Sequence, residues 1–417
     1  MNNPFKLAIA HGPNFCNRTA EKKLLCHNMR SGIHTVVYAP RRYGKSSLAA
    51  VVGDQLTDMT CIYVDLFSVT SPEDVAEKIY RGIVGTLGHK AADKTSLAAR
   101  ILASFKSLRL NIEFSQVTSL PEFSVSLGEA SAEIHLEHII SSLDHYCASH
   151  GIKVCLVLDE FQEICELKES KKIEALLRGG MQSAKHVSFL VMGSRRTILR
   201  DMFEDRKRPF YKSAFVYMLP PIQSDEFAAF LVERYAEFGK VLSQSDALSM
   251  VEFVDAYPYY VQKIAMLHFD MVGEYDELSR AKKLLVEMEA TDFEGIFLGL
   301  TNNQKRLLRA IAKQRPASIH SQAFLMAYRL GSQGGVQTSL AKLKKMDLVE
   351  MRDKLWRVVD PVFEKWLIGV TPTFMQKVQR ILLLSLQPNS ITSFFSSPTN
   401  NYSPLSYRHI PSAICWI

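Results

Sequence analysis

Residues 35–49 read Thr-Val-Val-Tyr-Ala-Pro-Arg-Arg-Tyr-Gly-Lys-Ser-Ser-Leu-Ala, and this stretch decides the fold. A short apolar run breaks at Pro40, passes a basic turn and reaches Gly44-Lys45-Ser46 before a helix-forming segment. A strand, a tight loop and a helix that opens with Gly-Lys-Ser are typical of a phosphate-binding P-loop. Ala39 stands where that pattern has its first glycine. Alone, the stretch is also compatible with an ordinary helix start, so the rest of the chain has to decide.

The chemistry of the loop favours a nucleotide. Backbone N–H groups at a helix N-terminus point at phosphate oxygens, and the helix dipole favours negative charge. Lys45 is expected to reach the β- and γ-phosphates, and Ser46 to place its hydroxyl on Mg²⁺. Arg41 and Arg42 either add positive charge beside the phosphates or pair with nearby acids. The predicted nucleotide-binding residues of the loop are Pro40, Arg41, Arg42, Tyr43, Gly44, Lys45, Ser46 and Ser47.

The composition is that of a globular chain with two or three domains. It has 417 residues, 47% of them apolar, and a charged fraction that is ordinary for folded proteins. Seven cysteines show no metal-ligand spacing, which indicates a reducing compartment. No signal peptide or membrane-spanning segment is apparent in the sequence, so we expect a cytoplasmic protein without a membrane partner.

An acidic pair supports the P-loop interpretation. Asp159-Glu160 follows the fully apolar run 154–158, which predicts a buried strand of a parallel sheet. Open α/β sheets bind ligands at the carboxyl ends of their strands, where the P-loop also lies. Asp159 is predicted to hold Mg²⁺, and Glu160 to orient and deprotonate the attacking water. The alternative is a plain surface turn.

Two further polar positions have equal alternatives. Ser194 follows the next buried strand, 187–192, and either senses the γ-phosphate or caps a turn. Arg208 closes a basic run before the last predicted strand, 214–219, which we also expect to be buried. It is either an arginine finger for a neighbouring copy in a homo-oligomer or part of a solvated loop.

The alternation of strands and helices predicts an α/β fold, with a doubly wound parallel-sheet P-loop core over residues 1–221. Alternating polarity around 107–127 predicts a β-hairpin insert in this core. Only helices are expected from 222 to 297, which we interpret as an all-α lid. Three helices and a hairpin over 298–368 predict a winged-helix domain. The polar stretch 369–417 looks like an unpacked tail.

The net charge of +7 is concentrated in the predicted winged helix. Residues 301–367 hold thirteen basic and five acidic side chains, so the rest of the chain is close to neutral. The cluster suits phosphate contacts on double-stranded DNA. A protein-interaction module or a solvated face is the alternative. The predicted contact residues are Lys342, Lys344 and Lys345 on the recognition helix, and Arg352 and Arg357 on the wing.

With these residues assembled, the chain resembles the archaeal-type ATPases, which belong to the AAA+-related STAND P-loop ATPases with a helical lid and a C-terminal winged helix. The motifs that carry the resemblance are Phe15, Arg18 and Glu21, the loop 40–46, Asp159–Gln162, Gly193-Ser194, Pro258–Tyr260 and Asp360–Phe363. The resemblance implies ATP, Mg²⁺ and a nucleotide-driven switch between the core and the lid, with Phe15 and Arg18 near the adenine. Ala39 and Lys212 depart from the family pattern, and Lys212 weakens any finger role in its segment.

Three functions follow from these expectations. The first is an ATP hydrolase, slow or partner-dependent, whose nucleotide state repositions the winged helix on DNA or on a protein. The second is a scaffold or signalling switch that holds ATP without hydrolysing it. The third is a DNA-binding regulator in which the nucleotide is structural.

Overall fold

The computed structural model describes residues 3–89, 111–115, 122–126 and 132–369. Its central sheet holds five parallel strands in the order β2-β5-β6-β1-β7. The strands are β1 (Thr35–Tyr38), β2 (Thr60–Asp65), β5 (Val154–Asp159), β6 (Val187–Gly193) and β7 (Phe215–Met218). This sheet, with the helices and the winged helix below, confirms the predicted α/β fold class. The expected unpacked tail lies outside the described residues, apart from Gly369.

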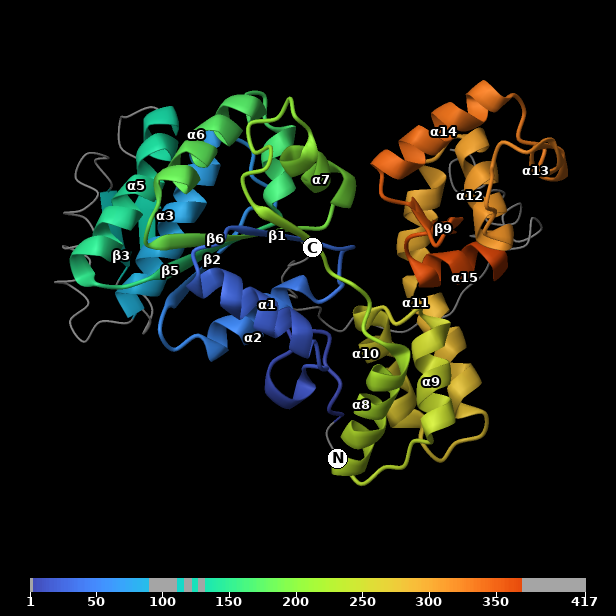
Figure 1. The fold of residues 1–417 in the computed structure, drawn as a ribbon. Helices are drawn as coiled ribbons and strands as arrows, with labels where there is room; N and C mark the ends of the chain where they lie inside the picture. Colours follow the sequence, from blue (N-terminus) through green and yellow to red (C-terminus); the bar gives the residue numbers. More distant parts are fainter. Residues whose placement is uncertain (1–2, 90–110, 116–121, 127–131, 370–417) are drawn as a thin grey trace, which may run out of the picture. The chain divides into compact units, whose positions relative to one another are not determined.

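Helices cover both faces of the sheet (Figure 1). One face carries α1 (Thr19–Arg30) and α2 (Lys45–Gln55), and the other carries α3 (Pro72–His89), α5 (Ala132–His150), α6 (Ser170–Ser183) and α7 (Arg196–Glu204). The second face holds a large apolar core, to which the helices contribute residues such as Ile79, Ile139, Leu177 and Phe203. Burial of that apolar area is the main favourable term in folding the domain.

The strand register brings the polar strand ends to one edge. Tyr38 at the end of β1 lies opposite Gly193 of β6, and Asp65 of β2 lies opposite Asp159 of β5. Since all five strands are parallel, the loops that follow them meet at this edge.

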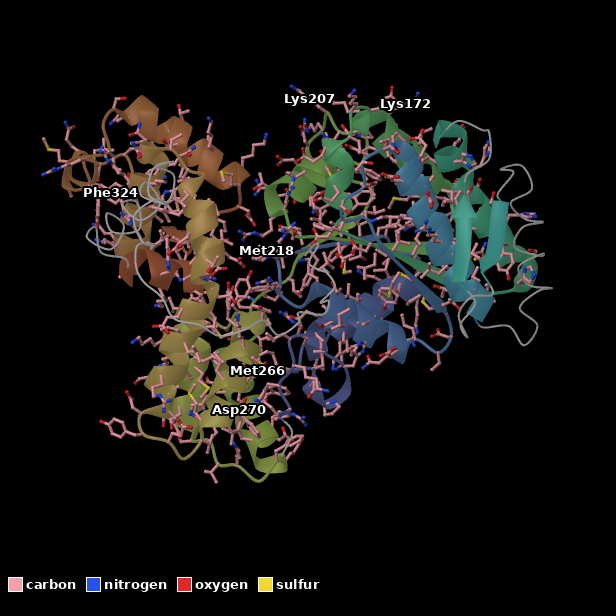
Figure 2. All side chains as sticks on the ribbon, turned by 180° about the vertical axis from the view of Figure 1, so that it is seen from behind. Lys172, Lys207, Met218, Met266, Asp270 and Phe324 are labelled. Atoms are coloured by element: carbon pink, nitrogen blue, oxygen red, sulfur yellow. The ribbon has the colours of Figure 1, made fainter. Side chains whose placement is uncertain are left out.

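Strand β7 differs from the prediction of a buried strand. It pairs only with β1 and closes one side of the sheet. Phe215 is 45% exposed and Met218 58% exposed, and Figure 2 labels Met218. An apolar run shows a strand but not its place in the sheet, so the expectation of burial was wrong here. The predicted hairpin insert is present as β3 (Asn111–Ser115) paired antiparallel with β4 (Glu122–Ser126), while its turn lies outside the described residues.

Between the sheet and the winged helix, the chain forms helices only, as expected. They are α8 (Ser224–Glu237), α9 (Gln244–Phe253), α10 (Pro258–Met271) and α11 (Glu277–Leu298). Pro258 is the first residue of α10, where its missing N–H leaves no bond unmade. The N-terminal segment reaches α10, because the Asn3 amide donates to the Met266 carbonyl at 2.8 Å and to Asp270 at 3.0 Å (Figure 2).

The winged helix has the expected three helices and hairpin. These are α12 (Asn302–Gln314), α13 (Gln322–Ala327), α14 (Gln333–Lys345), β8 (Val349–Arg352) and β9 (Leu355–Val358). A further helix that the sequence analysis did not separate, α15 (Pro361–Gly369), follows the hairpin. Phe293 of α11 stacks on Phe363 of α15, so α11 contributes to the winged-helix core as well as to the lid. The predicted domain boundaries stay predictions.

No helix in the described ranges is long and apolar enough to cross a membrane.

Candidate nucleotide-binding site

The loop between β1 and α2 has the backbone that phosphate binding requires. Gly44 has a φ of +87°, a conformation that glycine adopts without steric cost, and α2 begins at the next residue. Arg42 also has a positive φ, +59°. Ala39 is not among the positive-φ residues, and its N–H approaches the Gly193 carbonyl at 3.4 Å, which prolongs the contact of β1 with β6. A side chain is therefore tolerated where the motif has glycine.

Lys45 is buried beneath this loop, with 5% of its surface exposed. Its ammonium donates to the carbonyl oxygens of Ala39 and Pro40, both at 3.1 Å. Burial lowers the pKa of Lys45, while the nearby Glu160 and Asp159 oppose that shift. Among the described residues it has no carboxylate within ion-pair distance, so its charge is available to an anion.

Asp159 is fixed through both carboxylate oxygens. Oδ2 accepts from the Ser46 hydroxyl at 2.6 Å, and Oδ1 accepts from the Glu160 N–H at 2.9 Å. Burial raises the pKa of Asp159, and the hydrogen bond from Ser46 opposes the rise. A hydroxyl and a carboxylate side by side next to a phosphate loop fit Mg²⁺, which is bound in proteins through one or two carboxylates together with substrate phosphates. Ser46 and Asp159 would hold the ion.

Glu160 and Ser194 meet at the same edge. Glu160 has a φ of +48°, and its Oε2 accepts from the Ser194 hydroxyl at 2.8 Å. Arg41 Nε lies 3.4 Å from the same hydroxyl. The predicted loop, metal, base and sensor residues therefore form one hydrogen-bonded group, although they come from three separate stretches of sequence.

A cavity of about 470 Å³ opens beside this group. Of the residues predicted for the nucleotide, it is lined by Phe15, Arg18, Arg42, Tyr43, Gly44, Lys45, Ser46, Ser47 and Glu160. The sequence analysis missed a second part of the lining, which consists of Lys6, Leu7, Ala8, Ile9, Ala10, Asn14, Cys16, Ile222, Phe227, Pro258, Tyr259 and Gln262. A volume of this size, lined by both apolar and polar side chains, is typical of small-ligand sites.

Arg18 forms a hydrogen bond with the backbone of the P-loop. Its guanidinium donates to the carbonyl of Pro220 at 2.9 Å and to that of Tyr43 at 3.4 Å. Burial lowers the pKa of Arg18, and Glu21, 3.6 Å away, opposes the shift. Arg18 thus joins the P-loop to the segment that enters the lid.

Arg42 is held by the lid. Its guanidinium lies 4.4 Å from the centre of the Tyr259 ring and 3.7 Å from the Glu289 carboxylate. Glu289 is itself buried and paired with Lys263. This acid on α11 was missed, because nothing in its local sequence marks it and only the packing of α11 beside α10 brings it to the loop.

Arg208 is not brought to the cavity. Its guanidinium pairs with the fully buried Glu174 and lies 2.9 Å from the Cys165 sulfur. Arg206 and Lys207 are exposed, as Figure 2 shows for Lys207. Pro40 and Arg41 do not line the cavity either, although Lys45 and Ser194 contact them.

Comparisons with known families agree with this geometry. The family described as an AAA domain matches residues 29–203, and the family described as a probable winged helix domain matches residues 291–369. The chain thus contains an AAA domain followed by a C-terminal winged helix domain. These matches confirm the AAA and winged-helix parts of the resemblance drawn from the sequence.

Solved structures share the fold of this chain. The Walker-type ATPase PABY2304 of Pyrococcus abyssi is 17% identical with a TM-score of 0.63, and the match covers 87% of this chain and 99% of that one. The ORC2 protein of Aeropyrum pernix, in its ADPNP-ADP complexes, is 16% identical with a TM-score of 0.55, covering 90% of this chain and 98% of the other. At these identities the likeness concerns the fold alone. No curated protein matches the chain.

The cations of the winged helix fall into two groups. Lys342, Lys344 and Lys345 are exposed on α14, as predicted. The wing arginines are paired within the molecule, since Arg352 lies 3.0 Å and Arg357 4.0 Å from Asp255 in the lid. A wing contact with DNA would therefore compete with Asp255.

Arg196 of the core forms ion pairs with two acids of the winged helix. Arg196, the first residue of α7, pairs with Asp347 at 2.9 Å and with Glu350. Burial disfavours the charged guanidinium, but the two carboxylates outweigh that effect and raise the pKa of Arg196. Since Arg196 follows Ser194 by two residues, a short piece of backbone joins the predicted sensor residue to the winged helix.

Proposed function

We propose that this AAA-type ATPase binds ATP in the 470 Å³ cavity, hydrolyses it with Glu160 as the general base, and transmits the nucleotide state to the winged helix. The observation that carries the proposal is the group formed by Lys45, Ser46, Asp159, Glu160 and Ser194, described above. Each member has a separate role in phosphoryl transfer, and the strand ends bring all of them to one edge.

In this mechanism the adenine packs against Phe15 and Phe227, two apolar side chains that line the cavity. The backbone N–H groups at the start of α2 and the Lys45 ammonium bind the phosphates. Glu160 accepts a proton from water as the water oxygen bonds to the γ-phosphorus and the bond to the bridging oxygen of ADP breaks. The Ser194 hydroxyl donates a hydrogen bond to the γ-phosphate, so its contacts depend on whether that phosphate is present. Mg²⁺ between Ser46 and Asp159 would neutralise developing charge on the phosphates.

The lid supplies a route from the loop to the winged helix. Arg42 in the loop pairs with Glu289 of α11, and the same helix presents Phe293 to the α15 aromatics Phe363 and Trp366. Phosphates beside the loop would compete with Glu289 for Arg42. We therefore propose that nucleotide binding changes the position of α11 and with it the winged helix.

The winged helix would act on double-stranded DNA or on a protein partner. Exposed lysines on α14 favour DNA, because counterion release from the phosphate backbone drives such binding. A finger role for Arg208 would need a second copy of the chain and the release of Arg208 from Glu174. Mass measurement with and without ATP tests that homo-oligomer.

Phosphate release by the full chain and by Glu160→Gln tests hydrolysis. We expect kcat to fall by about 10²- to 10⁴-fold in the variant, while binding of a fluorescent ATP analogue is retained. Glu166→Gln is the matched control, since Glu166 is exposed, pairs with Arg195 and does not line the cavity. If wild type and Glu160→Gln both bind ATP but neither releases phosphate, with or without duplex DNA, the non-hydrolysing switch replaces this proposal.

A further inference from the structure

The side chain of Gln162 touches the proposed base from within the protein. Gln162 lies in the 3₁₀ helix η3 (Phe161–Glu166), two residues after Glu160, and is fully buried. Its Nε2 donates to Glu160 Oε2 at 2.5 Å and to Glu163 Oε1 at 3.3 Å. A carboxylate only accepts hydrogen bonds, so the nitrogen end of the amide has to face the two acids.

The oxygen of the Gln162 amide has no hydrogen-bond partner among the described residues. This atom, Oε1, is itself buried. A buried acceptor left unpaired destabilises the folded protein, and an apolar side chain of similar length would avoid that cost. Packing alone therefore favours methionine or leucine here, and what the glutamine supplies in return is the N–H group that it gives to Glu160.

The absence of a side chain at Gly193 leaves room for the Gln162 amide. A Cβ at Gly193, the last residue of β6, would lie 2.0 Å from Gln162 Oε1. Gly193 does not have a positive φ, so its backbone conformation does not call for glycine. The close approach of the Gln162 amide explains the missing side chain at this position.

Two donors thus converge on a single oxygen of the base. Glu160 Oε2 accepts from Gln162 Nε2 and from Ser194 Oγ, and Ser194 follows Gly193 directly. With Oε2 occupied, the carboxylate is held in one orientation, and Oε1 is left to receive a proton. A general base has to be held within hydrogen-bond reach of the water that it activates.

We propose that Gln162, seated against Gly193, is a positioning residue that holds the Glu160 carboxylate in its working orientation. The inference rests on the proposed function, because it assigns Glu160 the role of base. Gln162 acts through Glu160 and does not touch the nucleotide, since it does not line the cavity.

The test is steady-state ATP hydrolysis by Gln162→Met, with nucleotide affinity measured separately. Loss of an outer partner of this kind typically costs about 10- to 100-fold in activity, so we expect kcat to fall by that factor with KM and nucleotide Kd unchanged. Gly193→Ala displaces the same amide from the opposite side and should give the same split between kcat and KM. In the Glu160→Gln background, Gln162→Met should cause no further loss, because the group it positions is already gone.

Gln304→Met is the matched control, since Gln304 is another buried glutamine, in the capping box of α12. It should lower the melting temperature and leave kcat unchanged. An unchanged kcat in Gln162→Met overturns the inference while leaving the proposed function in place. So does a parallel loss of nucleotide binding and stability without a kcat effect, or a further loss in the Glu160→Gln background. If wild type itself releases no phosphate, the proposed function fails and the inference falls with it.

Discussion

The nucleotide cavity and the winged helix treat positive charge in opposite ways. Beneath the P-loop, Lys45 is buried against backbone carbonyls, and no carboxylate among the described residues forms an ion pair with it. In the winged helix, Arg352 and Arg357 share Asp255 of the lid, while Asp347 and Glu350 take Arg196 from the core.

The difference shows where a ligand is needed. A buried cation without an acid is costly until an anion arrives, so the cavity is built for a polyanion. Cations that already have acids hold domains together, and an external anion has to displace those acids first. In the winged helix, the exposed lysines of α14 have no such acid within ion-pair distance among the described residues.

The largest effect expected from breaking an internal pair is that of Arg196→Ala. The guanidinium pairs with two carboxylates and is mostly buried. Its removal leaves Asp347 without a cation within ion-pair distance among the described residues, and Glu350 with Arg352 at 3.9 Å. Breaking a buried pair costs about 3–5 kcal/mol, and the denaturant midpoint of the winged helix should shift accordingly. Arg200→Ala, on the same helix, is the neighbouring control, since its pair with Glu204 is exposed and is worth at most about 1 kcal/mol. Equal effects of the two variants would contradict the assignment of Arg196 as the link.

The unpaired lysine of the cavity should give the next largest effect, on nucleotide binding. Lys45→Ala removes hydrogen bonds from a charged donor, worth about 1.5–3 kcal/mol, or about 10- to 150-fold in Kd. Because burial lowers the pKa of Lys45, it loses its proton at a lower pH than an ordinary lysine, whose pKa is 10.5. ATP affinity should therefore fall as the pH rises, and the fall should begin below pH 10.5. Titration of a fluorescent ATP analogue against pH measures this.

Lys45→Arg serves as the control for the pH effect, since a guanidinium stays charged throughout the range. Its pH profile should be flat over the interval in which the wild-type affinity falls. The linkage also has a sign in the protein without nucleotide, where the unfolded chain binds the proton more tightly. The contribution of Lys45 to stability should then rise with pH while ATP affinity falls. An ATP affinity independent of pH up to 10.5 would show that Lys45 does not bind the phosphates.

The sequence predicts the cavity well where the chemistry follows strand ends. Gly44, Lys45 and Ser46 are adjacent in sequence, and Asp159 and Ser194 each follow an apolar run that had to be a buried strand. Parallel strands place these ends together whatever the details of packing.

What the sequence did not predict depends on packing between distant elements. Glu289 meets Arg42 and Lys263 only because two lid helices lie against each other and against the loop. The exposure of Met218 depends on strand order, which hydrophobic periodicity does not contain. The interaction of Gln162 with Glu160 depends on a turn with positive φ and on the space left by Gly193.

The exposed lysines of α14 test whether the winged helix binds the phosphates of DNA. Replacement of Lys342, Lys344 and Lys345 by glutamine should weaken duplex DNA binding by about tenfold or more at low salt. Each lost phosphate contact should reduce the slope of log K against log salt by about 0.9. Lys313→Gln, at an exposed position of α12, is the control and should leave the slope unchanged. Binding measured between 50 and 200 mM salt (about the range over which such contacts are resolved) decides it, and unchanged slopes would favour a protein partner.

The smallest effect is expected at Asp255, which pairs with Arg315, Arg352 and Arg357. Asp255→Asn removes the acid that Arg352 and Arg357 share, while Arg315 keeps its pair with Glu364, so duplex affinity should rise and its salt dependence should steepen. Exposed ion pairs are worth about 0–1 kcal/mol, which limits the gain to about fivefold. Asp353→Asn, next to the turn of the hairpin and paired with Arg357 at 3.9 Å, is the matched control and should give a smaller gain, because it releases one arginine only. A loss of affinity in Asp255→Asn would mean that the lid orients the wing for DNA. Asp255 would then not be a competitor, and the opposition between internal acids and external phosphates would not extend to the wing.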